Sequence, residues 1–329
     1  MAMNRRNRTL RTSPAIRDLT AETVITANDF IVPLFVTEGK GIREEISSMP
    51  GYYRLSLDHL KLEIKELWSL GLKSVLLFVK VPDNLKDDNC SEALNKKGLM
   101  VRAIQAVKDT EPGMCVMTDV ALDPFSPYGH DGLVKDKEII NDETVKVLAE
   151  MSVLHAWAGA DFVAPSDMMD GRIAGIRKAL EESGYTKTGI LAYSAKYASC
   201  FYGPFRDALD SAPGFGDKKT YQMDYRNRIE AIKEVQQDIE EGADIVMVKP
   251  AGSYLDIIRE VKNAVHVPVA AYQVSGEYAM IKAAAKSGWL NEDAAVLETL
   301  TAIKRAGADL IASYFAKDFA VRAKVKGER

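Results

Sequence analysis

Two lysines stand at the carboxyl ends of apolar runs that have the character of buried strands. Lys196 closes residues 189–196, and Lys249 closes residues 244–249. An ammonium group is costly to desolvate, so burial at such a position lowers the pKa of the lysine and favours the neutral amine. A neutral amine can attack a ketone carbonyl and form a Schiff base. Both lysines are therefore candidates for covalent catalysis.

The alternative is that each lysine extends its amine from the strand end into solvent. Lys80 shows why this alternative matters, because it closes the apolar run 75–80 in the same way. A lysine at a strand end does not identify a catalytic group by itself. The residues around each lysine must separate the two interpretations.

Carboxylates gather near a third apolar run. Asp119, Ala121 and Asp123 fall at alternate positions of one predicted strand, which places them on one face, and Asp131 follows in a turn. Several carboxylates at one strand end favour a hard divalent ion such as Mg²⁺, whereas zinc in an all-carboxylate site would be unusual. The alternative is a set of helix caps and turn aspartates.

Strand-like runs alternate with helical patterns along most of the chain. We predict strands at 31–36, 75–79, 114–122, 161–164, 190–194, 245–249, 269–274 and 310–314, and helices at 57–70, 142–158, 226–241 and 292–305. Continuous apolar strands with intervening helices indicate a parallel sheet covered on both faces.

Eight such strands are the number that closes a (β/α)8 TIM barrel, an α/β fold in which catalytic groups gather at the carboxyl ends of the strands. A Gly-Ala-Asp junction between a helix and the next strand recurs at 159–161, 242–244 and 307–309. An open doubly wound sheet is the structural alternative. It is disfavoured because no glycine-rich phosphate loop follows an early strand.

Two segments lie outside this alternation. Residues 200–224 combine glycines and prolines with aromatic residues directly after Lys196, as expected for an active-site lid; a mobile surface insertion is the alternative. Residues 1–29 carry several arginines and few apolar residues. They could form a disordered tail, a targeting peptide or an arm that packs on another subunit, and composition alone favours the tail.

Composition limits the classes of function. The chain has 329 residues, 47% of them hydrophobic, and a net charge of −4, so it suits one large barrel with additions and has no general attraction to nucleic acid. No apolar run reaches membrane-spanning length. Three cysteines, far apart and odd in number, argue against a disulfide framework and favour a cytoplasmic location.

Longer stretches resemble a known family. Residues 119–132, 193–199, 221–224, 247–252, 272–279 and 304–316 are similar to the corresponding segments of the porphobilinogen synthase family, also called the delta-aminolevulinic acid dehydratase family. The resemblance extends over essentially the whole chain. It implies a lyase that condenses two molecules of 5-aminolevulinate into porphobilinogen with loss of two waters, in tetrapyrrole (heme or chlorophyll) biosynthesis.

The resemblance also implies roles for individual residues. Lys249 matches the lysine that holds the first substrate as a Schiff base, and Lys196 matches the lysine for the second, which leaves Lys80 without a role. Other positions correspond to groups that bind the two substrate carboxylates or line the pocket. These are Ser275 and Tyr314 for one carboxylate, Arg206 and Lys218 on the lid for the other, and Tyr272 and Phe201 for the lining.

The family divides by metal use, and this chain resembles the branch without catalytic zinc. Ala121, Asp123 and Asp131 stand where the zinc branch carries cysteines. Whether these aspartates hold Mg²⁺, hold a monovalent ion or act as acid–base groups stays open. Glu234 matches the position of an allosteric Mg²⁺ near a subunit contact, although its carboxylate-rich helix alone would indicate a solvated face.

The resemblance implies a homo-octamer in which N-terminal arms embrace neighbouring barrels, so it favours the arm for residues 1–29 and leaves 30–329 as the catalytic barrel. Two other functions compete with the synthase. A Schiff-base aldolase on the same barrel would need one lysine, and a non-catalytic barrel that binds aminolevulinate or Mg²⁺ would not depend on both.

Overall fold

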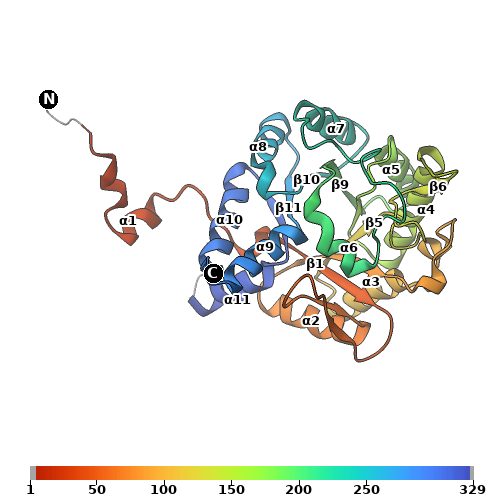
Figure 1. The fold of residues 1–329 in the computed structure, drawn as a ribbon, viewed down its shortest axis with the longest axis horizontal. Helices are drawn as coiled ribbons and strands as arrows, with labels where there is room; N and C mark the ends of the chain where they lie inside the picture. The colour runs from red at the N-terminus through yellow and green to blue at the C-terminus, as the bar shows by residue number, and fades with distance from the viewer. Residues whose placement is uncertain (1–4, 327–329) are drawn as a thin grey trace.

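The computed structural model describes residues 5–326 and contains a closed barrel of parallel strands (Figure 1). Its strands, in the order in which they pair, are β1 (Phe30–Thr37), β4 (Ser74–Lys80), β5 (Cys115–Val120), β8 (Phe162–Pro165), β9 (Gly189–Lys196), β10 (Ile245–Lys249), β11 (Val269–Gln273) and β12 (Leu310–Ser313). β12 pairs with β1, with Phe30 opposite Ile311, and this pairing closes the sheet. The prediction of a (β/α)8 barrel is confirmed.

Helices surround the barrel, and shorter elements decorate it. The helices after the arm are α2 (Leu57–Ser69), α3 (Leu99–Thr110), α4 (Asn141–Ala158), α5 (Arg172–Glu182), α6 (Gly203–Leu209), α7 (Ile229–Glu240), α8 (Leu255–Ala264), α9 (Ser275–Lys286), α10 (Glu292–Ala306) and α11 (Ala316–Lys326). Strands β2 (Arg43–Glu45) and β3 (Tyr53–Leu55) extend the sheet beside β1, and β6 (Leu133–Lys135) pairs with β7 (Glu138–Ile140). No helix within residues 5–326 is both long and apolar enough to cross a membrane.

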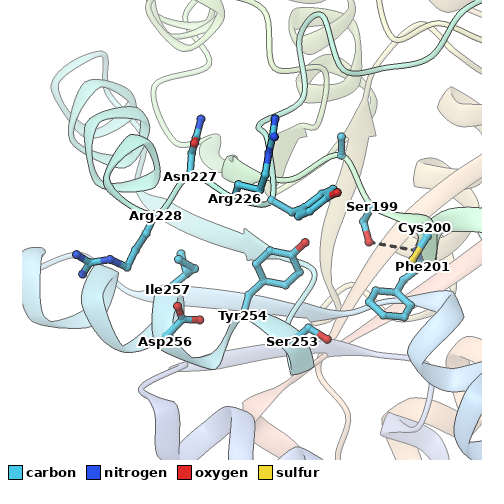
Figure 2. A pocket seen from close by; sticks show the side chains of 12 residues that line it. Ser199, Cys200, Phe201, Arg226, Asn227, Arg228, Ser253, Tyr254, Asp256 and Ile257 are labelled. Atoms are coloured by element: carbon cyan, nitrogen blue, oxygen red, sulfur yellow. Dashed lines mark hydrogen bonds between the residues drawn. The ribbon is translucent and has the colours of Figure 1, made fainter.

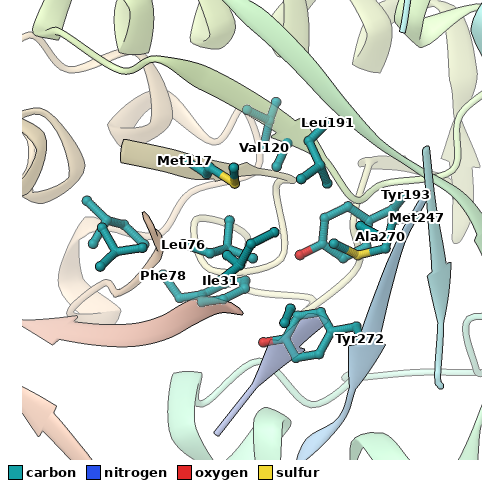
Figure 3. Close-up of a cluster of buried hydrophobic side chains, with 14 of the residues drawn as sticks. Ile31, Leu76, Phe78, Met117, Val120, Leu191, Tyr193, Met247, Ala270 and Tyr272 are labelled. Carbon is teal, nitrogen blue, oxygen red and sulfur yellow. The ribbon is translucent and has the colours of Figure 1, made fainter. Parts of the chain in front are cut away.

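The barrel interior is filled by side chains (Figure 3). Ile31, Leu76, Leu191 and Met247 come from four different strands and are fully buried. Tyr193 and Tyr272 also point into this interior, with their rings 6.3 Å apart. The interior is therefore a packed core and not a pore, so the space for chemistry lies at the ends of the strands.

The recurring Gly-Ala-Asp junctions fasten neighbouring strands together. In each, the aspartate carboxylate accepts a hydrogen bond from the first part of the adjacent strand: Asp161 from Val116 N at 2.7 Å, Asp244 from Ile190 N at 2.7 Å and Asp309 from Val269 N at 2.8 Å. Each aspartate N–H also donates to the same strand, as Asp244 does to Ile190 O at 3.0 Å. Each of these three aspartates also forms an ion pair with a nearby lysine or arginine.

One predicted strand ends earlier than expected. β5 stops at Val120, so Ala121 and Asp123 do not continue it and the predicted alternation with Asp119 is wrong. The chain turns here because the Leu122 carbonyl accepts hydrogen bonds from Phe125 N and Ser126 N, both at 3.0 Å. This local turn follows directly after the strand end.

The two segments outside the alternation both contain helical elements within the described residues. The segment 200–224 contains α6, whose start is favoured by Pro204 in its first turn. At the amino end, residues 7–11 and α1 (Pro14–Leu19) form short helical turns that project away from the barrel (Figure 1). Leu10, Leu19 and Val24 are exposed there. A projecting, partly apolar segment suits an arm better than a tail.

The junction aspartates should contribute to stability and not to chemistry. For Asp244→Ala we expect a loss of about 1 kcal/mol in the free energy of unfolding, because a charged hydrogen bond to Ile190 N is removed from a half-exposed site. Thermal unfolding should show a midpoint lowered by about 2–4 °C. Asp109→Ala, at an exposed position of α3, is the matched control. Equal midpoints for the two variants would contradict this assignment.

Candidate active site

The two lysines lie side by side at the carboxyl ends of adjacent strands. Lys196 on β9 is the register partner of Lys249 on β10, and both are almost fully buried. Lys80 ends β4 in a different environment, where its Nζ lies 2.6 Å from Asp210 of the lid and the side chain is partly exposed. The structure thus separates the pair from the lysine that resembled them in sequence.

Lys249 is enclosed by aromatic rings. Its Nζ lies 4.7 Å from the ring centre of Tyr272, 5.0 Å from those of Tyr193 and Phe205, and 5.1 Å from that of Tyr202. Burial, together with the neighbouring Lys196, lowers the pKa of Lys249 to about 7. Near neutral pH a large fraction of this amine is unprotonated and can act as a nucleophile.

Lys196 has a polar environment instead. Its Nζ donates to Asp131 Oδ2 at 3.0 Å and to the Ser166 carbonyl oxygen. Lys218 of the lid donates to the other oxygen of the same carboxylate at 2.6 Å. Burial alone would raise the pKa of Asp131, but the two ammonium groups lower it below its usual range. Asp131 is therefore a fixed counter-ion shared by a barrel lysine and a lid lysine.

The aspartates do not form a metal site in this arrangement. Lys218 Nζ lies 3.5 Å from Asp123 Oδ2 as well as 2.6 Å from Asp131 Oδ1, so an ammonium group occupies the space between them. Within residues 5–326 no cluster of three or more His, Cys, Asp or Glu side chains could hold a metal ion. With the lid in this position, the Lys218 ammonium group stands between Asp123 and Asp131, where a cation was predicted.

Asp119 is the carboxyl group best suited to proton transfer. Its Oδ1 is buried without a hydrogen-bond partner among the described residues. Burial, and then the charge of Asp123, raises the pKa of Asp119 to about 7. A carboxyl group with this pKa can both take and release a proton near neutral pH.

The other predicted substrate-binding residues fall into two groups. Arg206 and Lys218 line the same small space as Lys196 and Lys249. Ser275 and Tyr314 lie behind the aromatic rings: Ser275 Oγ accepts from Phe205 N at 2.9 Å, and the Tyr314 hydroxyl is 2.9 Å from that of Tyr272. Ser275 and Tyr314 therefore each contact a residue whose ring lies beside Lys249, but neither lines the small space around the amine.

Phe201 is the exception. It lines a separate outer cavity of about 550 Å³ beyond the start of the lid, together with Tyr254 and Arg226 (Figure 2). Its backbone oxygen, and not its ring, faces Ser275, at 3.4 Å. Phe205, four residues further along, places its ring beside Lys249 in the position that Phe201 was expected to hold.

The lid is closed over the site. The space left between the charged residues is about 20 Å³, which is room for roughly one water molecule and not for two substrates. Substrate entry therefore requires the lid to open or the Phe205 ring to move. Figure 1 shows α6, the helical part of the lid, over the strands at the centre of the molecule.

Sequence reasoning missed several residues that line the site. They are Tyr193, Tyr202, Phe205, Gln222 and Ser166. The aromatic composition of the lid indicated that something packs there, but not which ring reaches Lys249. Ser166 contacts Lys196 through its carbonyl oxygen, which carries no signal in a side-chain pattern, and its side chain lowers the pKa of Asp119.

Glu234 lies apart from this site, on the side of α7 that faces a polar cavity of about 690 Å³. It is half-buried, and Asp170 and Glu230 line the same cavity. Burial raises the pKa of Glu234, and the nearby carboxylates Asp238, Asp170 and Glu230 add to the effect. Such a surface fits a hydrated Mg²⁺ held by one or two carboxylates, which keeps several of its water ligands.

The fold and the site define a barrel enzyme with two lysine amines in one closed pocket. A family model described as delta-aminolevulinic acid dehydratase matches residues 4–322. The chain belongs to this family, whose members are lyases. Delta-aminolevulinic acid dehydratase of Chlamydia pneumoniae is 52% identical over 316 residues, covering 96% of this chain and 95% of the relative. The Bacillus subtilis protein of the same name is 51% identical, covering 96% and 97%.

Solved structures agree with the assignment. The crystal structure of the Toxoplasma gondii delta-aminolevulinic acid dehydratase (porphobilinogen synthase), in complex with the reaction product porphobilinogen, has a TM-score of 0.95 at 48% identity. The match covers 97% of this chain and 92% of that one. An aldolase named QR15, 15% identical with a TM-score of 0.51, shares the fold alone.

The low pKa of Lys249 has a measurable consequence. Trapping a keto-acid substrate on Lys249 with cyanoborohydride should increase as pH rises through about 7, where the amine loses its proton, and not near the usual lysine value of 10.5. Phe205→Ala should admit water, reduce the desolvation of the amine and move the midpoint to higher pH. Phe201→Ala, a lid aromatic outside the inner site, is the control. A midpoint above pH 9 in the unaltered protein would contradict the prediction.

Proposed function

We propose that Lys249 and Lys196 each hold, as a Schiff base, one of the two 5-aminolevulinate molecules that this porphobilinogen synthase condenses. The observation that carries the proposal is the pairing of two buried amines at adjacent strand ends in one closed site. Each imine forms as a ketone oxygen leaves as water. Both amines are regenerated when the pyrrole ring is complete, so two waters are released and the atoms balance.

Lys249 is the better nucleophile and takes the first substrate. Burial and the neighbouring Lys196 lower its pKa to about 7, so a large fraction of the amine is unprotonated near neutral pH. Ser275 and Tyr314 lie on the same side, where a hydroxyl pair can bind the first carboxylate once the Phe205 ring moves. The four rings around the amine also exclude water, which protects an imine from hydrolysis.

The second substrate binds at Lys196, next to the lid. Arg206 and Lys218 supply the positive charge for its carboxylate, and Asp131 orients both Lys196 and Lys218. Asp119, with its pKa near 7, is placed to move the protons that carbon–carbon bond formation and ring closure require. Closure of the lid holds the two substrates together, so that their reaction becomes effectively intramolecular.

We further propose that Glu234 holds an allosteric Mg²⁺ and that no catalytic zinc is used. The support is the carboxylate-lined cavity around Glu234 and the aspartates at the positions of the zinc-branch cysteines. Bound Mg²⁺ would neutralise part of the negative charge on this face of α7. Glu234 is the residue that would anchor the hydrated ion, which would keep most of its water ligands.

The assembly and location proposed are a homo-octamer of arm-exchanged subunits in the cytoplasm. The projecting arm with exposed Leu10, Leu19 and Val24 supports the assembly, because such residues gain from burial on a neighbour. Cys90, Cys115 and Cys200 are free thiols, which suits a reducing compartment. The relatives from Physcomitrium patens and Selaginella martensii carry the word chloroplastic in their names.

The roles of the two lysines can be tested by substitution. Lys249→Met and Lys196→Met should each reduce formation of the pyrrole from 5-aminolevulinate by at least about 10³-fold, since the covalent intermediate is lost. Borohydride should label Lys249 in the unaltered protein and in Lys80→Met, which is the matched strand-end control. Absence of pyrrole under every metal condition would exclude the synthase. Normal turnover by Lys196→Met would favour an aldolase-like use of one lysine.

The metal proposal has a separate test. Glu234→Ala should keep the basal rate but lose the increase in rate on addition of Mg²⁺, because the carboxylate that anchors the hydrated ion is gone. Lys233→Ala, at an exposed neighbouring position, should respond to Mg²⁺ as the unaltered protein does. An unchanged response in Glu234→Ala would remove the assignment, and restoration of activity by zinc alone would overturn the zinc-free interpretation.

A further inference from the structure

A buried histidine joins the lid to the loop that carries Asp131. His130 lies in the loop between β5 and β6 and is fully buried. One ring nitrogen, Nδ1, lies 3.1 Å from the hydroxyl of Tyr221, and the other, Nε2, lies 3.0 Å from the backbone oxygen of Phe215. Both partners belong to the lid, so the imidazole bridges two points of it that are six residues apart in sequence.

The donors and acceptors around the ring assign its protons. The Phe215 carbonyl can only accept, so Nε2 carries the hydrogen and donates to it. The backbone N–H of Asp131 donates to the Tyr221 oxygen at 3.3 Å, which leaves the Tyr221 hydroxyl free to donate to Nδ1. Every polar atom of this cluster is satisfied when the imidazole is neutral with its proton on Nε2.

The lid packs closely on the same loop at neighbouring positions. The N–H of Gly214 donates to the carbonyl of Tyr128 at 2.8 Å. Gly129, with a φ of +64°, leaves no space for a side chain, because a Cβ atom there would lie 2.3 Å from the Ala212 oxygen. Residues 128–131, which we call the lid seat, therefore receive the lid from Ala212 to Tyr221.

The lid seat is also part of the charged site. Asp131 holds Lys196 of the barrel and Lys218 of the lid through its carboxylate, and its own N–H is held by Tyr221. Tyr221 follows Lys218 by three residues in the turn whose backbone bond joins Gln222 N to Lys218 O at 2.9 Å. A change at His130 is therefore transmitted to the Lys218–Asp131 contact through one tyrosine.

We propose that His130 is a positioning residue that latches the closed lid and so sets the geometry of Asp131 and Lys218. It touches neither lysine amine and acts through Tyr221 and the Phe215 backbone. The effect on substrate binding rests on the proposed function, in which the lid closes over the second substrate. The latch itself is a property of the protein without substrate and can be measured independently.

The first test measures lid protection by hydrogen exchange of peptides from 210–224, without substrate. His130→Phe keeps a ring of similar size but removes both hydrogen bonds, so exchange across this segment should become at least about tenfold faster. Tyr221→Phe keeps the Nε2 bond to Phe215 but removes the bonds of the Tyr221 hydroxyl to His130 and to Asp131 N, so it should also make exchange faster. Because the two substitutions remove one shared bond, the double variant should show less than the sum of the two effects.

The second test separates a positioning role from a general structural one. His130→Phe should raise KM for 5-aminolevulinate about tenfold with a smaller change in kcat, since Lys249 and Lys196 are intact. His130→Gln restores a donor toward Phe215 O and His130→Asn restores an acceptor toward Tyr221, so each should recover part of the loss. Phe201→Ala, in the lid but away from the lid seat, controls for general loosening of the lid.

Unchanged exchange at 210–224 in both His130→Phe and Tyr221→Phe would overturn the latch, whether or not the protein makes porphobilinogen. A roughly tenfold loss of kcat in His130→Phe, with KM and exchange both unchanged, would also overturn the latch. Such a result would give His130 a part in the chemical step and not in positioning the lid. If His130→Phe does not fold, exchange at 210–224 is measured in His130→Gln and Tyr221→Phe. Faster exchange supports the latch, and unchanged exchange in both variants overturns it.

Discussion

Two amines buried side by side at adjacent strand ends are the constraint on which the rest of the site depends. The register of β9 and β10 places Lys196 opposite Lys249, and two ammonium groups there would repel each other in a medium that solvates neither. The protein treats them differently. Burial and the neighbouring Lys196 favour the neutral form of Lys249, and the Asp131 carboxylate compensates Lys196. This asymmetry is what the proposed binding of two identical substrates at different positions requires.

The barrel supplies the rigidity that this arrangement needs. Its strands are fastened at their starts by the aspartates of the Gly-Ala-Asp junctions, each bonded to the neighbouring strand, and the interior is filled by apolar side chains and tyrosines. Stability is thereby concentrated at the amino end of the barrel and in its core. The carboxyl end of the barrel carries the buried charged groups of the site, although removing them from water costs free energy.

The lid completes the electrostatics as well as the enclosure. Lys218 enters the site as the second cation on Asp131, so closing the lid changes the charge balance around Lys196. Phe205 adds one of the four rings around Lys249 in the same movement. Because the remaining space is about 20 Å³, the lid or the Phe205 ring must move before substrate can enter. The cluster at His130 lies where the lid meets the loop that bears Asp131.

The sequence by itself determined the barrel, the two lysines and the family, because strand periodicity, the junctions and the long motifs are local properties of the chain. The local strand pattern could not separate Lys80 from Lys249; the longer family motifs did, and the neighbours across the barrel differ in the same way. The sequence also placed Asp123 on a strand that ends at Val120 and expected Phe201 where Phe205 stands. These positions depend on where the chain turns and on which lid residue reaches the strand ends. Such contacts between distant segments exist only in the tertiary structure.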